Sequence, residues 1–134
     1  MKKKLLALLL ATVATTALAE FTPIYQVNNG NILLIDRSTI KPVNNGTLNW
    51  FNGKKGNRQV WEMINTNDPY APFKSAKSLV EINCDTRQTN LISFTSFSGI
   101  NGSGSIISSS KPKPEWDYAM PDTAGAALVD AVCK

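Results

Sequence analysis

Alternation of apolar and polar residues is clearest in residues 79–84. Leu79, Glu81 and Asn83 would occupy one face of a strand, and Val80, Ile82 and Cys84 the other. The pattern predicts a β-strand that points Cys84 toward the core.

Further short segments between Phe21 and Ser110 predict an antiparallel meander, because turn residues separate them at suitable spacings. The expected strands are residues 21–27, 32–36, 47–51, 58–64, 89–97 and 105–110, with 47–51 paired to 58–64. In the segment 89–97, Ile92 and Phe94 are expected on a common face. Asn- and Gly-rich turns are expected at 28–31, 44–46 and 52–57, a loop with two prolines at 65–74, and a flexible hairpin tip at 98–104.

The C-terminal part of the chain predicts one helix. Residues 111–114, Lys-Pro-Lys-Pro, are expected to end the sheet, because proline donates no ladder hydrogen bond. Thr123 is a plausible N-cap. Apolar residues then recur at helical spacing: Ala124, Ala127, Leu128, Ala131 and Val132. The expected fold class is therefore α+β, a mainly antiparallel sheet meander with one C-terminal α-helix.

The N-terminus has the pattern of a cleavable signal peptide. Lysines at 2–4 precede an apolar run at 5–13 and a small-residue site, Ala17-Leu18-Ala19. We expect residues 1–19 to be removed and residues 20–134 to form one exported domain, periplasmic or secreted. The leader contains no cysteine, so a lipid-anchored lipoprotein is not expected.

Removal of the leader changes the charge of the protein. Three of the 14 basic residues lie in the leader and none of the ten acidic ones, so the mature formal charge falls from +4 to +1. The remaining basic residues are scattered, which disfavours nucleic-acid binding. Because no other apolar stretch approaches ~20 residues, no membrane span is expected.

Export would place the two cysteines in a compartment where disulfides persist. Cys84 and Cys133 have one possible intramolecular pairing, and the bond would hold the last helical turn against the sheet. In the chain-entropy model this stabilises the fold by about 4 kcal/mol. The alternative is two free buried thiols.

The composition removes most catalytic and metal chemistry. The chain has no histidine and only two thiols, so it lacks the residues for Ser-His-Asp, Cys-His and Cys-rich zinc sites. Two acidic pairs, Glu81 with Asp85 and Glu115 with Asp117, show no spacing that defines a catalytic cleft. We therefore expect no catalytic residue, cofactor or metal.

A mixture of aromatic and basic residues surrounds the expected turn at 52–57, a combination common at protein-binding hot spots. The candidate partner-binding residues are Trp50, Phe51, Lys54, Lys55, Arg58 and Trp61. In the alternative interpretation, the tryptophans fill the core side of the sheet and the lysines solvate a turn.

Several segments resemble the bacterial surface-adhesin protein E family in their order and spacing. They are residues 34–40, residues 75–84, Arg87, Gly104, Trp116, Pro121-Asp122-Thr123, Ala127-Leu128 and Cys133-Lys134. The resemblance implies an antiparallel sheet with a disulfide-tethered C-terminal helix. It also implies a role at the cell envelope, with a host matrix or envelope protein as the partner.

Two functional hypotheses follow. The first is an exported, non-enzymatic binding module that acts through protein contact, at a sheet edge or at the 50–61 segment, with homodimerisation through a strand edge as a further possibility. The second is a small periplasmic hydrolase, or hydrolase inhibitor, that uses polar groups of the loop Ser98–Gly104.

Overall fold

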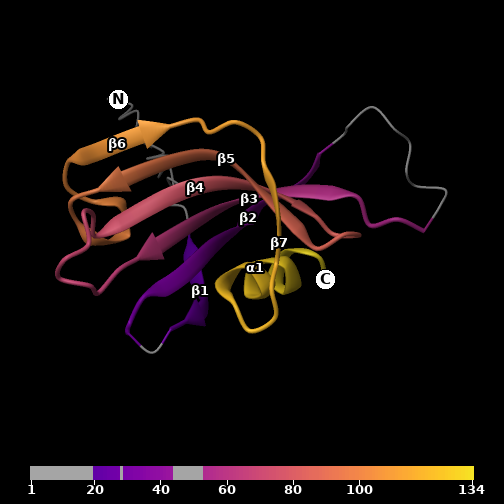
Figure 1. Ribbon diagram of the computed structural model, residues 1–134, viewed down its shortest axis with the longest axis horizontal. Helices are drawn as coiled ribbons and strands as arrows, with labels where there is room; N and C mark the ends of the chain where they lie inside the picture. Colours follow the sequence, from indigo (N-terminus) through magenta and orange to yellow (C-terminus); the bar gives the residue numbers. More distant parts are fainter. Residues whose placement is uncertain (1–19, 28, 44–52) are drawn as a thin grey trace, which may run out of the picture.

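The computed structural model of the protein describes residues 20–27, 29–43 and 53–134. Antiparallel pairing joins seven strands into one sheet, with the path β1-β2-β3-β4-β5-β6 and with β7 on β5. The strands are β1 (Phe21–Gln26), β2 (Ile32–Val43), β3 (Asn57–Asn65), β4 (Ser75–Asn83), β5 (Gln88–Phe97), β6 (Ile106–Ser110) and β7 (Trp116–Tyr118). Figure 1 shows this meander, with helix α1 (Ala124–Val132) packed on one face. The predicted fold class is confirmed.

Strand β2 is longer than the sequence pattern predicted. Its pairing with β3 is irregular after Asp36. Asp36 pairs with Trp61, and the next paired residue of β2, Lys41, pairs with Gln59. The Asp36 carboxylate accepts hydrogen bonds from the backbone N–H of Ser38 at 3.0 Å and from its hydroxyl at 2.6 Å. These bonds compensate the burial of a polar group inside the sheet. Strand β3 pairs with β2 on one side and with β4 on the other. The sequence pattern had predicted residues 47–51 as its partner, and that segment lies outside the described residues.

A bulge in β5 changes which side chains face the helix. Leu79 pairs with Ser93 but Val80 pairs with Leu91, so Ile92 is an extra residue in the ladder. A β-bulge shifts the two-residue alternation. Leu91 therefore lies opposite the core residue Val80, a position that simple alternation with Phe94 had given to Ile92.

The sequence prediction that Lys-Pro-Lys-Pro ends the sheet is corrected by β7. After the prolines the chain returns to the sheet, and Trp116, Asp117 and Tyr118 pair with Asn90, Thr89 and Gln88 of β5. Two prolines interrupt a ladder only at their own positions, so a three-residue strand forms beyond them. Strands β6 and β7 thus share one side of β5, and residues 111–115 connect them.

Helix α1 begins after Thr123 as predicted, because the Thr123 hydroxyl accepts a hydrogen bond from the N–H of Ala126 at 3.3 Å. Its buried residues are Ala126, Leu128, Val129 and Val132. Val129, which the predicted apolar stripe omitted, is completely buried. Across residues 20–27, 29–43 and 53–134, no helix has the length and hydropathy needed to cross a membrane.

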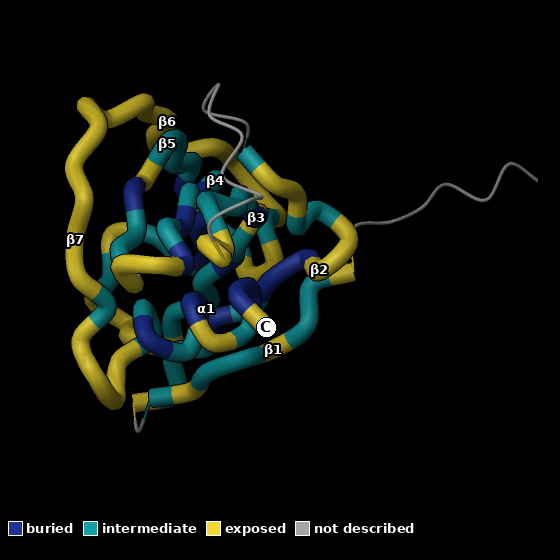
Figure 2. Tube along the Cα trace, turned by 90° about the vertical axis from the view of Figure 1, so that its right-hand side faces the viewer, coloured by how far each residue is buried: buried dark blue, intermediate teal, exposed yellow. Residues whose placement is uncertain are grey.

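The disulfide joins the end of α1 to the end of β4. Cys84 and Cys133 are bonded, with their Cα atoms 5.5 Å apart. Both cysteines belong to the apolar cluster between sheet and helix, together with Ile35, Ile82 and Val129. Figure 2 shows these buried positions between α1 and the sheet. The predicted covalent link between helix and sheet is confirmed.

The hairpin tip between β5 and β6 is docked against the sheet. Its 3-10 turn η2 (Ile100–Gly102) receives the hydroxyl of buried Ser75, which donates to the carbonyl of Gly99 at 2.6 Å and accepts from the N–H of Gly102 at 2.9 Å. Gly102 has a φ of +72°, and a Cβ there would lie 2.5 Å from the Lys77 side chain. The Lys77 side chain could move away, so it is the positive φ that favours glycine in this turn.

Candidate functional site

The predicted partner-binding residues do not all share one surface. Arg58 and Val60 face the helix side of β3, and the Arg58 guanidinium donates to the carbonyl of Val132 at 3.1 Å. Trp61 alternates with them and points to the opposite face, with 39% of its surface exposed. Arg58 thus satisfies a C-terminal carbonyl of α1. Trp50 and Phe51 lie outside the described residues.

Lys54 and Lys55, which were also predicted to bind a partner, lie in a turn that Asp85 stabilises. The Asp85 carboxylate accepts hydrogen bonds from the backbone N–H groups of Lys55 and Gly56, both at 2.9 Å. These two bonds, with a smaller contribution from the charges of Lys54 and Lys55, lower the pKa of Asp85 below its usual value. Lys54 and Lys55 remain available to solvent, and their role in partner binding stays a prediction.

The outer edge of the sheet carries exposed apolar side chains. Every residue of β6 and β7 is exposed, and Figure 2 shows this segment as an outer rim. On β6, Ile106 and Ile107 are 65% and 49% exposed, and on β7, Trp116 and Tyr118 are 38% and 70% exposed. We call this surface, formed by β6 and β7, the outer edge. The adjacent isoleucines in a serine-rich strand were the sequence signal for it.

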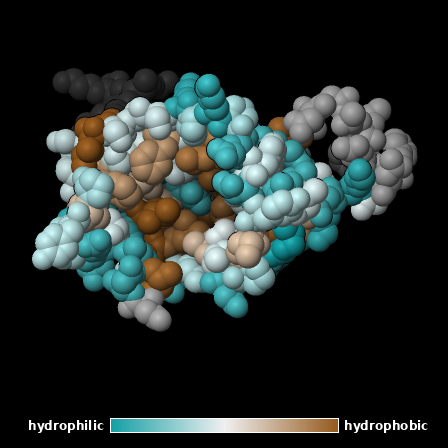
Figure 3. Space-filling model, viewed as in Figure 1, coloured by the Kyte–Doolittle hydropathy of each residue, from teal (hydrophilic) through white to brown (hydrophobic). Residues whose placement is uncertain are grey.

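A pocket of about 380 Å³ lies on the helix-bearing face, between β2–β5, α1 and the connection from β6 to β7. Figure 3 shows apolar side chains at the bottom of the hollow. Its apolar lining comprises Leu33, Ile64, Val80, Leu91, Pro112, Ala124 and Leu128. The volume is within the range of small-molecule sites.

Glu62 is the unexpected residue of this pocket. It lies in β3 between Val60, a core residue, and Ile64, which packs against the core, and on the same face as both. Glu62 is partly buried among these apolar neighbours, and the resulting desolvation raises its pKa to about 7. Glu115 and Asp117 enter the same pocket from the β6–β7 connection and β7. An acidic residue in an apolar strand pattern was the signal that sequence reasoning missed.

The other polar candidate residues take part in hydrogen bonds within the fold. At the hairpin tip, the Ser98 hydroxyl accepts from the N–H of Ser105 at 2.8 Å, and the Ser103 hydroxyl donates to the carbonyl of Ile100 at 2.6 Å. Glu81 accepts from the side-chain amide of Asn57 at 2.8 Å. In the described ranges, no three His, Cys, Asp or Glu residues gather in a way that would hold a metal ion.

Comparison with known proteins identifies the family and the fold. The sequence model of the family described as surface-adhesin protein E matches residues 21–134. No curated protein sequence matches the chain. Crystal structures of Haemophilus influenzae protein E are similar in fold. The selenomethionine form has 18% identity and a TM-score of 0.58 over 83% of this chain and 84% of that one. Protein E from non-typeable H. influenzae has 19% identity and a TM-score of 0.55 over 83% and 74%.

At these identities the structural likeness shows the fold, whereas the family match extends from the first residue of β1 to the end of the chain. The residues that carried the sequence resemblance include Cys84 and Cys133, which the fold joins in a disulfide. The chain therefore belongs to the surface-adhesin protein E family.

Proposed function

We propose that the protein is an exported, non-enzymatic binding module of the bacterial cell envelope that acts through protein–protein contact. Membership of an adhesin family supports the general role. The observation that carries the proposal is the outer edge, where β6 exposes all five of its residues at the border of the sheet. An edge strand offers unpaired backbone groups to which an extended segment of a partner can add as a further strand.

The outer edge also supplies the apolar contacts that such a partner requires. Ile106 and Ile107 stand on β6, and Trp116 and Tyr118 on β7, all substantially exposed. Large aromatic and aliphatic side chains supply most of the energy at protein interfaces, and the backbone pairing supplies orientation. Pro112 and Pro114 interrupt the edge between the two strands and limit pairing to β6.

A capture experiment tests this surface. The wild-type protein and an Ile106→Lys/Ile107→Lys variant would be immobilised and exposed to purified envelope and matrix proteins. We expect the variant to lose at least about tenfold in affinity for any partner that the wild type binds, because charge on an edge strand opposes strand addition. Ile100→Lys is a matched control, since Ile100 is 58% exposed but lies on η2.

Equal binding by the wild type and the edge variant would contradict a role for β6. In the same series, Trp50→Ala tests the aromatic and basic residues predicted from the sequence. A loss confined to Trp50→Ala would move the binding surface from the outer edge to that segment.

A second copy of the chain is an alternative occupant of the outer edge. Sedimentation of the wild type and of Ile106→Lys/Ile107→Lys measures this directly. Dimers that dissociate only in the variant would assign the edge to homodimerisation.

Non-enzymatic action is supported by the hairpin tip, whose Ser98 and Ser103 hydroxyls take part in hydrogen bonds within the tip. A hydrolase or hydrolase inhibitor that uses this loop would need such groups to face a substrate.

Export is tested separately, by cell fractionation and N-terminal sequencing. We expect a mature chain that begins at Glu20 in the periplasm or medium.

A further inference from the structure

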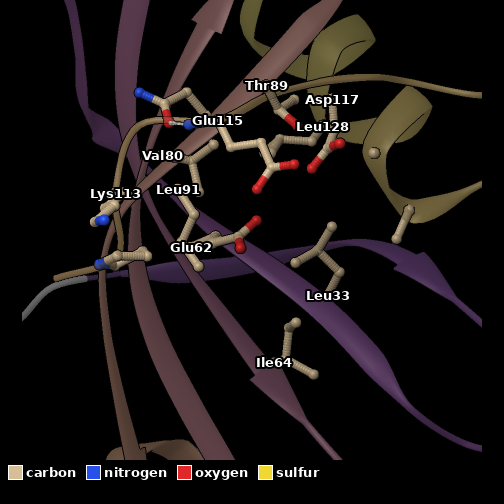
Figure 4. A pocket seen from close by; sticks show the side chains of 14 residues that line it. Leu33, Glu62, Ile64, Val80, Thr89, Leu91, Lys113, Glu115, Asp117 and Leu128 are labelled. Atoms are coloured by element: carbon tan, nitrogen blue, oxygen red, sulfur yellow. Dashed lines mark hydrogen bonds between the residues drawn. The ribbon is translucent and has the colours of Figure 1, made fainter. Parts of the chain in front are cut away.

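The pocket on the helix-bearing face has both an apolar and a charged lining. Its floor and walls include Leu33, Ile64, Val80, Leu91 and Leu128, from four strands and α1. Three carboxyl groups and one ammonium group also line it, from Glu62, Glu115, Asp117 and Lys113. Figure 4 shows the carboxyl groups of Glu62 and Glu115 directed toward each other across the cavity, with Asp117 beside them.

Among residues 20–27, 29–43 and 53–134, Glu62 has no side-chain partner that would explain its position. In the described part of the chain, none of the side-chain hydrogen bonds involves Glu62, and the ion pair is formed elsewhere, by Arg87 and Asp130. Its ladder neighbours in the sheet are Ile35 of β2 and Ser78 of β4, neither of which carries a charge. A carboxyl group placed in apolar surroundings without a partner destabilises the fold when it is ionised. Such a residue is a candidate for ligand binding.

The other groups around Glu62 define the charge of the pocket. Helix α1 contributes Ala124, Gly125 and Leu128, and β5 contributes Thr89, Asn90 and Leu91, so neither element adds a formal charge. Lys113, Glu115 and Asp117 come from the β6–β7 connection and β7, and Glu62 comes from β3. Three carboxyl groups therefore face one ammonium group, and the pocket favours a positively charged occupant.

We propose that this pocket binds a small amphipathic amine, with its ammonium group among Glu62, Glu115 and Asp117 and its hydrocarbon body against Leu33, Ile64, Val80 and Leu128. The occupant is a free small molecule, because the cavity of about 380 Å³ suits one. The ammonium group supplies the partner that Glu62 lacks. Apolar contact supplies the remaining affinity.

Binding is coupled to the proton of Glu62. Because burial raises the pKa of this carboxyl to about 7, much of it is protonated at neutral pH. An ammonium group in the pocket favours the ionised form, so binding releases a proton and lowers that pKa. The affinity for an amine should therefore rise by up to about tenfold between about pH 6 and pH 8.

Nuclear magnetic resonance titration of the whole mature protein with hexylamine tests the proposal, with hexanol and hexanoate as uncharged and anionic probes of the same length. We expect saturable shifts of the amides of Val80, Leu91 and Leu128 with hexylamine. Hexanol should bind at least about tenfold more weakly, and hexanoate more weakly still.

Glu62→Gln removes the charge with little change of shape, and we expect it to weaken hexylamine binding about tenfold and to remove most of its pH dependence. Asp117→Asn, at an exposed position, should give a smaller loss that cannot be attributed to core disruption. Glu81→Gln is the matched control, because Glu81 lies outside the pocket and bonds to Asn57.

Three results would overturn the proposal. They are equal affinity for hexylamine and hexanol, shifts that map outside the pocket, and a Glu62→Gln variant that binds hexylamine as tightly as the wild type. None of these measurements depends on the proposed protein partner, so failure of one proposal leaves the other intact.

Discussion

The C-terminal helix and the outer edge both come from the C-terminal part of the sequence, but different interactions attach them to the rest of the fold. Helix α1 buries Leu128, Val129 and Val132 against the sheet and is bonded to it through Cys133. The outer edge keeps every residue of β6 and β7 exposed and is held by ladder hydrogen bonds to β5. Burial and a covalent bond make the helix a structural element, whereas exposed apolar residues at the outer edge are free to make contacts with other molecules.

Removal of the disulfide should have the largest effect and should fall on the helix side of this comparison. Cys84→Ala/Cys133→Ala is expected to lower the free energy of unfolding by about 4 kcal/mol, because the unfolded chain gains the entropy that the closed loop removed. Urea denaturation measures the loss. Amide hydrogen exchange should accelerate in α1 more than in β6. An unchanged denaturation midpoint would show that packing alone holds the helix.

Glu62 lies in the pocket between the two regions, and its substitution should change stability in a pH-dependent way. The folded pKa, about 7, lies above the ordinary value of 4.5. Because of Glu62, the wild type loses stability as the pH rises from about 4.5 to about 7. Glu62→Gln should exceed it by up to about 3 kcal/mol at about pH 8 and match it at about pH 4. A difference that is the same at both pH values would contradict the burial effect.

Paired truncations compare the two regions directly. Val129→Ala, at a position with no exposed surface, should cost about 2 kcal/mol through the lost contacts and the cavity that remains. Ile107→Ala, at a position 49% exposed, should change the free energy of unfolding by less than about 0.5 kcal/mol. Thermal and urea denaturation of both variants provide the measurement. Similar losses would mean that the outer edge also contributes to the stability of the fold.

The smallest expected effect concerns the first turn of the helix. Thr123→Ala removes the hydroxyl that accepts from the N–H of Ala126 and should cost about 1 kcal/mol. Thr86→Ala, at an exposed turn between β4 and β5, is the control and should be nearly neutral. If the two variants have equal stabilities, capping does not contribute to the attachment of α1.

Local patterns predicted the elements that depend on neighbouring residues. The alternation around Val80 and Ile82 predicted β4 and the inward direction of Cys84, and the hydroxyl of Thr123 predicted the start of α1. The family resemblance added support for the disulfide-tethered fold. These elements could be predicted because turns, caps and alternation depend on φ preferences and on hydrogen bonds between residues a few positions apart.

Features that depend on distant partners escaped the same reasoning. The bulge that places Leu91 opposite Val80, the return of β7 to β5 and the approach of Glu115 and Asp117 to Glu62 all join residues far apart in the sequence. A one-residue change of register reverses which face a side chain occupies, so these placements could not follow from composition or spacing.

By itself, the sequence determined a meander closed by a capped helix and supplied the two thiols that join them. Only the tertiary structure decided which apolar residues remain exposed at the outer edge and where carboxyl groups meet in the pocket. The physical reason is that strand and helix signals act along the chain, whereas burial, charge and cavities arise between segments that pairing brings together.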